Sequence, residues 1–508
     1  MKEDESMERW KKVLLGALCL VMAVAGGAFA EAKDVLTVAN IYDAKTLDPI
    51  ATNDVASSGV CLHVYDNLLA LGPDGVPVPQ LAEKYEIIDP TTYKFYLRKG
   101  VTFHNGEPFT AADVKYTFER AKSPAGASIR QYVDDIDTIE VVDDSTVVFK
   151  LKRPFTPFLL ALTHTAGSIL NQKAVEAAGD NYGMNPVGTG PFVFKAWAKG
   201  DKITLERNDA YWGHKPAYKT LVMRSIPEPT NRTIELESGA VDLAYQITTN
   251  DLKRVEENPK LSLLRVVDNS TTYMGFNCSK APFDNSKVRK AISMALDTVG
   301  LQKAVWRGVG KAPIGPVAPN VLYSYKDFQP HVQNVEEAKK ILAEEKVTLP
   351  LAVQIWTNER KERIDMATII QSQLAEVGIN AEIKVLEWGA YLDGLKQKTH
   401  DMFLLGWVAS VPDPEFAISG VFHSSMVGST NFTYFVDAEV DKMMEAGKAL
   451  PNGPDREKAY VELQKRIDDL CPWVYLHNDE QIVGAQKNVK GFVPSPRGYH
   501  ILTDVTFE

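Results

Sequence analysis

The sequence predicts an α/β protein of several domains, and three observations support this. Residues 364–377 repeat apolar side chains with helical spacing, Gly378 follows, and residues 379–385 alternate apolar and polar side chains as a strand does. Helix, glycine and strand in this order are typical of α/β domains. The 508 residues allow about three domains of ordinary size. No Pro- or Ser-rich linker separates them, so we expect the chain to cross between domains several times.

The same periodicities predict further elements along the chain. Alternating or short apolar runs indicate strands, and apolar residues spaced three and four apart indicate a helix. Taken in order, strands are expected at 35–39, 92–99, 147–151 and 379–385, and helices at 286–297 and 364–377.

The composition is that of a soluble globular protein. Hydrophobic residues make up 45% and charged residues 24%, which excludes a disordered chain, a fibre and a multi-span membrane protein. The 56 basic residues are outnumbered by 66 acidic ones, giving a formal charge of -10. A basic surplus is typical of nucleic-acid binders, so no nucleic-acid partner is expected.

The first 30 residues have the pattern of a signal peptide. An apolar run from Val13 to Ala25 follows basic residues, and Ala28-Phe29-Ala30 forms a small-x-small cleavage site. We expect residues 1–30 to be removed after Ala30, with translation starting at Met1 or Met7, and the mature protein to be periplasmic. A retained anchor is the alternative interpretation.

Three cysteines remain after the predicted cleavage: Cys61, Cys278 and Cys471. Export permits a disulfide, but an odd number leaves at least one thiol unpaired. One bridge and three buried thiols both stay open at this point. No Cys-x-x-Cys pair indicates a redox or zinc motif.

No catalytic motif is found. The sequence has no Gly-x-Ser-x-Gly, His-Glu-x-x-His, Walker loop or GxGxxG. No histidine has a second one three or four residues away, so structural histidines are expected and no metal site. Gly188-Thr189-Gly190 is followed by Pro191, which favours a tight turn over a phosphate loop. We therefore expect a protein that is not an enzyme and has no cofactor; an exported hydrolase is a remote alternative.

A series of phrases resembles a known family. In order they are LAEKYEIIDPTTYKFYLRKGVTF at 81–103, HNGEPFTAADVKYTFER at 104–120, NPVGTGPF at 185–192, AYWGHKP at 210–216, PFDNSKVRKAISMALD at 282–297, LEWGAY at 386–391 and LLGWVASVPDP at 404–414. Together they resemble the family 5 extracellular solute-binding proteins, which are the dipeptide, oligopeptide and nickel receptors of bacterial ABC importers. The resemblance extends from Leu36 to Glu508.

The resemblance implies a two-lobed periplasmic-binding-protein fold (class II type, cluster C) with an extra accessory domain. Lobe I would comprise 31–64, 190–269 and 482–508, the accessory domain 65–189, and lobe II 270–481. It also implies a monomer that closes on a small solute and delivers it to ABC permease transmembrane subunits with cytoplasmic ATPases. The most favoured solute is a short peptide; a nickel chelate, glutathione, haem or a sugar are alternatives, with His423 as the candidate for a chelate site.

In peptide-binding members an aspartate binds the α-ammonium, three residues after the tryptophan of a Gly-Trp-x-x-Asp stretch. Here Gly406-Trp407 is followed at that place by Ser410, which carries no charge. Asp413 and Asp54 are therefore the alternative amine partners. Thr52 and Asn53 are expected to border the cleft beside Asp54.

The family's carboxylate-binding region resembles residues 356–363, WTNERKER. Trp356, Asn358 and Arg360 are candidates there, and Arg360 or Arg363 would pair with a carboxylate through two hydrogen bonds. A solvated helix start is the alternative for this segment. Aromatic walls are expected from Tyr132 and Trp407, whereas Trp388 and Tyr391 are expected to be packing residues.

Overall fold

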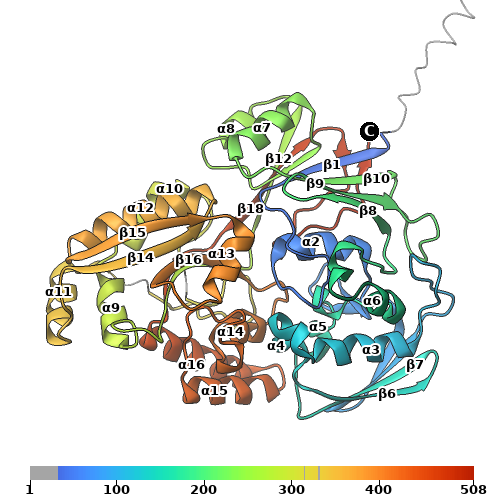
Figure 1. The fold of residues 1–508 in the computed structure, drawn as a ribbon, viewed down its shortest axis with the longest axis horizontal. Coiled ribbons are helices and arrows are strands. Elements are labelled where there is room, and N and C mark those ends of the chain that lie inside the picture. The colour runs from blue at the N-terminus through green and yellow to red at the C-terminus, as the bar shows by residue number, and fades with distance from the viewer. Residues whose placement is uncertain (1–32, 314, 330–331) are drawn as a thin grey trace, which may run out of the picture.

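The computed structural model describes residues 33–313, 315–329 and 332–508. Three main sheets with helices packed on them form the molecule (Figure 1). The predicted signal peptide, residues 1–30, lies outside the described residues. Within the described ranges, no helix has the length and apolar character needed to cross a membrane.

The first sheet has seven strands in the order β12-β18-β11-β1-β10-β9-β8. Strand β1 lies near its centre and pairs in parallel with β10 and β11; the other pairs are antiparallel. The predicted strand at 35–39 is confirmed as β1. The strands are β1 (Val35–Asn40), β8 (Phe192–Ala198), β9 (Lys202–Arg207), β10 (Thr220–Ser225), β11 (Leu243–Tyr245), β12 (Leu261–Val267) and β18 (Glu480–Gln486), and the helices that accompany them are α2 (Val55–Val64), α7 (Pro229–Ser238) and α8 (Leu252–Glu256).

The second sheet has five strands in the order β15-β14-β16-β13-β17. They are β13 (Ser270–Phe276), β14 (Leu351–Asn358), β15 (Ile379–Leu386), β16 (Met402–Val408) and β17 (Trp473–His477). Its helices are α9 (Ser286–Met294), α10 (Thr298–Trp306), α11 (Val335–Glu344), α12 (Lys361–Ala375), α13 (Trp388–Leu395), α14 (Pro414–Phe422), α15 (Ala438–Ala449) and α16 (Pro454–Leu470).

The predicted helix at 286–297 is shorter than expected. It is found as α9 and ends at Met294, because Asp297 caps a separate helix, α10, by accepting from the Gly300 amide. The predicted helix and strand on either side of Gly378 are confirmed as α12 and β15. Gly378 has a φ of +80°, which glycine adopts without strain.

A third, antiparallel sheet comes from the chain between α2 and β8, in the order β4-β5-β7-β6. The predicted strands at 92–99 and 147–151 are confirmed as its two central strands. Its strands are β4 (Ala82–Asp89), β5 (Thr92–Leu97), β6 (Ile136–Asp143) and β7 (Thr146–Leu151), and the nearby helices are α3 (Ala111–Ala121), α4 (Arg130–Val133), α5 (Phe158–Ala161) and α6 (Gln172–Ala178). Two small ribbons complete the strands: β2 (Leu69–Leu71) with β3 (Pro77–Pro79), and β19 (Val489–Lys490) with β20 (Thr506–Phe507).

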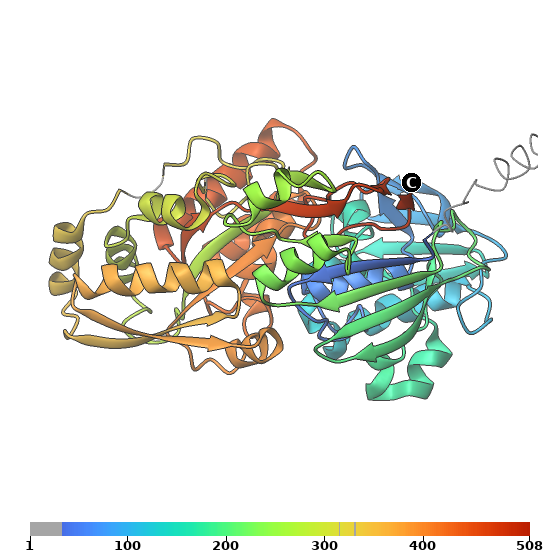
Figure 2. The same cartoon turned by 90° about the horizontal axis from the view of Figure 1, so that it is seen from above.

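The chain passes twice between the seven-stranded and the five-stranded sheet, and the two crossings lie side by side. Residues 268–269 join β12 to β13, and residues 478–479 join β17 to β18. The Asp268 amide donates to the Asp479 carbonyl at 3.0 Å, which ties one crossing to the other. Figures 1 and 2 show the two halves of the molecule on either side of this junction.

The Gly188-Thr189-Gly190 segment is a packing junction. The Gly190 amide donates to the Val64 carbonyl at the end of α2, at 2.9 Å. A Cβ on Gly188 would lie 2.1 Å from that same oxygen, so only glycine fits there. The close backbone contact explains the turn without any phosphate.

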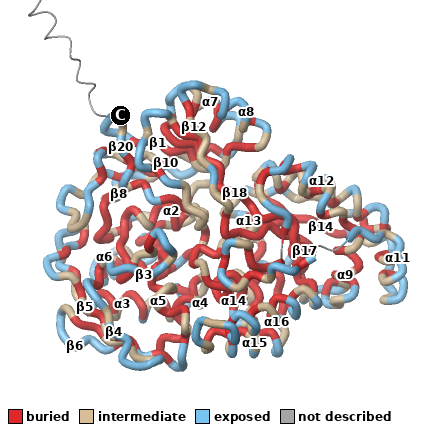
Figure 3. Tube along the Cα trace, turned by 180° about the vertical axis from the view of Figure 1, so that it is seen from behind, coloured by how far each residue is buried: buried red, intermediate tan, exposed pale blue. Residues whose placement is uncertain are grey.

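Burial follows the sheets and the helices that cover them (Figure 3). Cys61, Cys278 and Cys471 are free thiols, two of them buried, so no disulfide joins these three residues in the described structure. Histidines His63 and His400 are buried and bound to backbone carbonyls, as structural histidines are. In the described part of the chain, no group of three or more metal-ligating side chains is suited to hold a metal ion.

Candidate ligand-binding site

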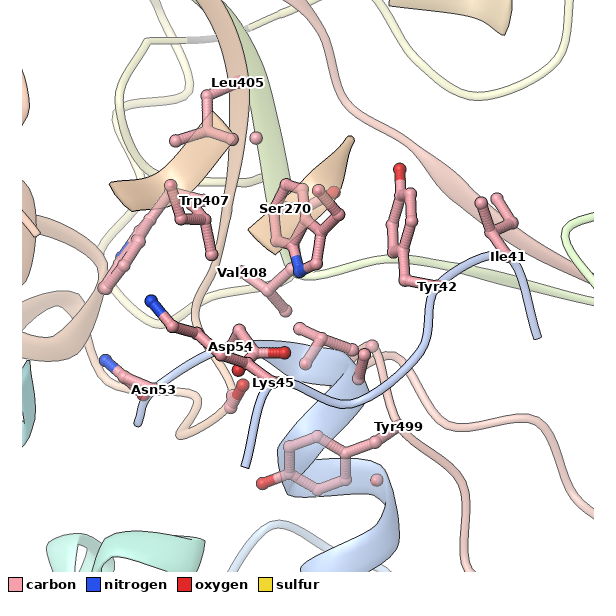
Figure 4. A pocket seen from close by; sticks show the side chains of 18 of the residues that line it. Ile41, Tyr42, Lys45, Asn53, Asp54, Ser270, Leu405, Trp407, Val408 and Tyr499 are labelled. Carbon is pink, nitrogen blue, oxygen red and sulfur yellow. The ribbon is translucent and has the colours of Figure 1, made fainter. Parts of the chain in front are cut away.

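A cleft lies where the two crossings join the sheets. Its cavity volume is about 200 Å³, which is room for a small organic ligand. One wall comes from the segment between β1 and α2, and the opposite wall from the end of β16 (Figure 4). The crossings themselves contribute Asp268, Ser270 and Asp479.

The first wall includes Thr52, Asn53 and Asp54. Asp54 caps α2: one carboxylate oxygen accepts from the Ser57 amide at 3.0 Å. The other oxygen accepts from the Thr52 hydroxyl at 2.5 Å. Asp54 therefore lines the cleft with both oxygens already hydrogen-bonded, which fixes its position. The Asn53 side-chain amide nitrogen is buried and has no protein partner.

The second wall includes Trp407 and Ser410. The Trp407 indole donates to the Phe416 carbonyl at 2.9 Å, so its ring is fixed against α14. The Ser410 hydroxyl donates to the Arg497 carbonyl at 3.3 Å, and the Ser410 carbonyl accepts from the Arg497 side chain at 2.7 Å. Both polar groups of Ser410 are thus engaged by the same residue.

An aromatic pair joins the first wall to α13. Tyr42 follows β1, and Trp388 begins α13; their rings stack with centroids 4.8 Å apart and an angle of 14° between planes. Both residues line the cleft. The expectation that Trp388 is only a packing residue is therefore corrected, whereas Tyr391 is fully buried and donates to the Leu404 carbonyl, as a packing residue does.

Two arginines line the cleft, and they differ in how they are paired. Arg360 binds both oxygens of Asp479, at 3.1 and 3.2 Å, and also binds Glu362. Burial lowers the pKa of Arg360, but the two carboxylates outweigh burial and raise it above the ordinary value. Burial likewise raises the pKa of Asp479. The positive charge of Arg360 outweighs this effect of burial, and the pKa of Asp479 falls to about 2. This pair is already neutralised within the protein.

Arg363, on the first turn of α12, is paired differently. Its guanidinium donates to the Asn358 side-chain oxygen at 2.8 Å, which positions it. Its Nε atom is buried and has no partner, and the side chain is 5% exposed. Within the described ranges, no carboxylate lies at salt-bridge distance from it. Arg363 therefore keeps its charge and a donor for a ligand.

Four of the ten predicted site residues do not line the cleft. Tyr132 is buried between His164 and Phe416, stacked on both rings. The Trp356 ring lies in the core, with its indole bonded to Gln354. Asn358 is fully buried behind Arg363.

Asp413 is the fourth, and the structure excludes it as an amine partner. It is 1% exposed and binds Arg456 through both oxygens, at 2.7 and 2.8 Å. One of these oxygens also accepts from the Glu415 amide, so Asp413 caps α14. His423, the candidate for a chelate site, also lies outside the cleft and faces Glu445 at 3.3 Å.

Several cleft residues were not predicted from the sequence. They share polar atoms that are buried without a partner: Tyr42, Tyr245, Gln246, Asp268, Ser270 and His500. The available signal was the short polar segment Asp268-Asn269-Ser270 between two apolar strands, which marks a crossing. The other residues carry no local pattern, because segments far apart in the chain bring them together.

Two sheets joined by adjacent crossings, with a polar cleft between them, define a two-lobed binding protein. Residues 76–429 match the model of the bacterial extracellular solute-binding proteins, family 5 (middle region). The chain belongs to this family.

Relatives and solved structures agree with this assignment. The glutathione-binding protein GsiB of Salmonella choleraesuis is 30% identical over 490 residues, covering 94% of this chain and 95% of that protein. The dipeptide-binding protein of Escherichia coli is 29% identical over 464 residues, covering 85% and 86%. The periplasmic binding protein DppA from Helicobacter pylori, solved with the peptide STSA, has a TM-score of 0.88 at 27% identity and covers 94% of this chain and 98% of that chain. The predicted periplasmic-binding-protein fold is confirmed.

Proposed function

We propose that this protein is an extracytoplasmic receptor that captures a short peptide, or a peptide-like solute with a free carboxylate, and delivers it to an ABC permease. The observation that carries the proposal is Arg363: a buried, positioned guanidinium that lines the cleft without a carboxylate partner in the described part of the chain. A guanidinium of this kind recognises a carboxylate through paired, charge-assisted hydrogen bonds.

The relatives support a peptide-like ligand. The named binding partners of the two similar proteins and of the solved neighbour are glutathione, dipeptides and the peptide STSA, and each carries a free carboxylate. A nickel chelate is less favoured, because His423 lies outside the cleft and faces acidic side chains. Haem and sugars stay as alternatives of the same receptor class, and we propose no catalytic activity.

The same proposal assigns the three sheets to three units. Lobe I is residues 31–64, 190–269 and 482–508, the accessory domain is 65–189, and lobe II is 270–481, so that the two crossings form the hinge. Binding then depends on closure of the lobes around the ligand. The proposed partners are the permease transmembrane subunits with their cytoplasmic ATPases. We also propose that the receptor is a monomer and that the leader exports it to the periplasm.

A thermal-shift screen of residues 31–508 tests this function. The protein is stripped of ligand by mild unfolding and mixed with di-, tri- and pentapeptides, glutathione, nickel-histidine and sugars. A ligand at 100 times its dissociation constant stabilises the fold by about 2.7 kcal/mol, a rise of about a few degrees. We expect shifts with peptides or glutathione and none with their C-terminal amides. Shifts with a sugar or a chelate alone would contradict the peptide proposal.

A further inference from the structure

The charged side chains that line the cleft are only partly paired within the protein. Lys45 and Lys396 both face Asp393, Arg360 is paired with Asp479, and Glu480 with Arg265. Arg363 and two aspartates, Asp54 and Asp268, then stay without a charged partner in the part of the chain that the structure describes. These groups suit a ligand that carries both an anionic and a cationic group.

Of the two aspartates, Asp268 has the open oxygen. One of its oxygens accepts from the Gln481 side chain, and the other, Oδ1, is buried without any partner. The residue is 2% exposed and lines the cleft. Both oxygens of Asp54, in contrast, already accept from the protein.

Neutral acceptors also line the cleft. The Ser270 hydroxyl, two residues after Asp268, is buried and unpartnered, and so is the Gln246 side-chain oxygen. Gln246 has a φ of 53°, a left-handed conformation that is uncommon for a residue other than glycine. An ammonium has three N–H donors and no acceptor, which suits a set of oxygens that lack donors.

We propose that Asp268 is the carboxylate that binds the ammonium group of the ligand, with Ser270 and Gln246 as neutral acceptors. The inference rests on the proposed function. It explains how a cleft with Ser410 in place of an acidic residue recognises an amine: the negative charge comes from the hinge crossing. Closure of the lobes and capture of the amine then involve the same segment.

This assignment makes binding depend on pH. Burial, and secondly the charge of Asp479, raise the pKa of Asp268 to about 8, although Gln481 and Arg360 lower it in part. The other charged or titratable groups around this crossing are Glu480 with its partner Arg265, and His477 beside Asp479. At pH 6 Asp268 is protonated in the free protein, so capture of an ammonium requires release of that proton. Affinity for an amine-bearing ligand should rise nearly tenfold from pH 6 to pH 7 and level off near pH 8, where an α-amine itself loses its proton.

Isothermal titration calorimetry at pH 6, 7 and 8 tests the proposal on wild-type residues 31–508. The probes are Ala-Leu, Ala-Ala-Ala and glutathione, each with its N-acetylated counterpart. We expect at least one free-amine probe to bind with the predicted pH dependence, and its N-acetyl form at least tenfold more weakly at pH 8. Asp268→Asn should lose at least tenfold in affinity for the free amine and lose the rise between pH 6 and 7. Asp54→Asn, which keeps a side chain able to cap α2, is the comparison variant at the other cleft aspartate and should lose less affinity for the free amine than Asp268→Asn. Asp365→Asn, at a residue that pairs with Lys361 outside the cleft, is the control and should behave as wild type.

Four results would overturn the proposal. N-acetylated probes that bind the wild type as well as free amines would remove the amine site, and that comparison needs no variant. Loss of binding in Asp54→Asn with binding kept in Asp268→Asn would assign the amine to Asp54. If no probe binds the wild type, the peptide function itself fails. If Arg363→Gln loses affinity for the free-amine probes and Asp268→Asn does not, the peptide function stands and the Asp268 assignment fails.

Discussion

Tyr42 and Trp388 stack face to face across the ligand cleft, with ring centroids 4.8 Å apart. Tyr42 follows the central strand of the seven-stranded sheet, and Trp388 begins the helix after the edge strand of the five-stranded sheet. An ion pair between Lys45 and Asp393 joins the same two segments. These contacts join the two proposed lobes.

Removal of this stack should weaken closure. Trp388→Ala removes an aromatic pair worth about 0.5–1.5 kcal/mol, so we expect ligand affinity to fall about two- to tenfold. The matched variant Trp388→Phe keeps a stacking ring and should keep most of the affinity. Small-angle X-ray scattering on the ligand-free proteins measures the shape directly and should show a larger radius of gyration for Trp388→Ala. An unchanged radius and affinity would show that the stack does not contribute to closure.

An acidic residue at position 410 should not create an amine site. Ser410 lies against Arg497, whose side chain donates to the Ser410 carbonyl at 2.7 Å. In Ser410→Asp the new carboxylate would pair with this guanidinium, and its charge would be neutralised before a ligand arrives. We expect less than a threefold gain in affinity for free-amine peptides, measured by calorimetry. Ser410→Asn is the uncharged control, and a tenfold gain specific to the aspartate would refute this expectation.

Asp413 should matter for stability. Its pair with Arg456 is fully buried, so Asp413→Ala leaves an uncompensated guanidinium and should cost about 3–5 kcal/mol of unfolding free energy. Asp365→Ala, which breaks an exposed pair with Lys361, should cost less than about 1 kcal/mol. Denaturant unfolding compares the two variants. Equal losses would be incompatible with a structural role specific to Asp413.

The buried carboxyl of Asp268 should make the free protein less stable as pH rises. In the unfolded chain the pKa of this carboxyl lies near its ordinary value of 3.8, whereas in the folded protein burial, as the largest cause, raises that pKa to about 8. Between these values the folded state binds the extra proton, so stability falls as pH increases through this window. Asp268→Asn should remove this contribution and raise the ligand-free unfolding midpoint at pH 7.5 more than at pH 5. A variant that is equally stabilised or destabilised at both pH values would contradict the raised pKa.

Local patterns predicted individual elements well and predicted side-chain neighbourhoods poorly. The strand at 35–39 and the order helix, Gly378, strand follow from hydrophobic spacing, which depends on adjacent residues only. Trp356 and Trp407 are both strand tryptophans, yet one lies in the core and the other lines the cleft. That difference is set by which helices cover each sheet face, and the sequence does not reveal it.

The same limit applies to charged residues. Asp413 and Arg456 are 43 positions apart, so nothing near Asp413 indicated that its charge is used inside the fold. Arg360 and Arg363 are separated by one helical turn, and only the location of Asp479 decides which of them stays free. Asp268 gained its place in the cleft because two crossings meet, a long-range feature of the topology.

The measurement that tests the central claim most directly is a double-mutant cycle at Arg363. Wild type and Arg363→Gln are titrated by calorimetry with a binding peptide from the screen and with its C-terminal amide. If Arg363 binds the carboxylate, amidation should weaken wild-type binding about 30- to 150-fold and change binding to Arg363→Gln by less than threefold. Equal losses on amidation in both proteins would contradict the account, because the carboxylate would then be recognised elsewhere.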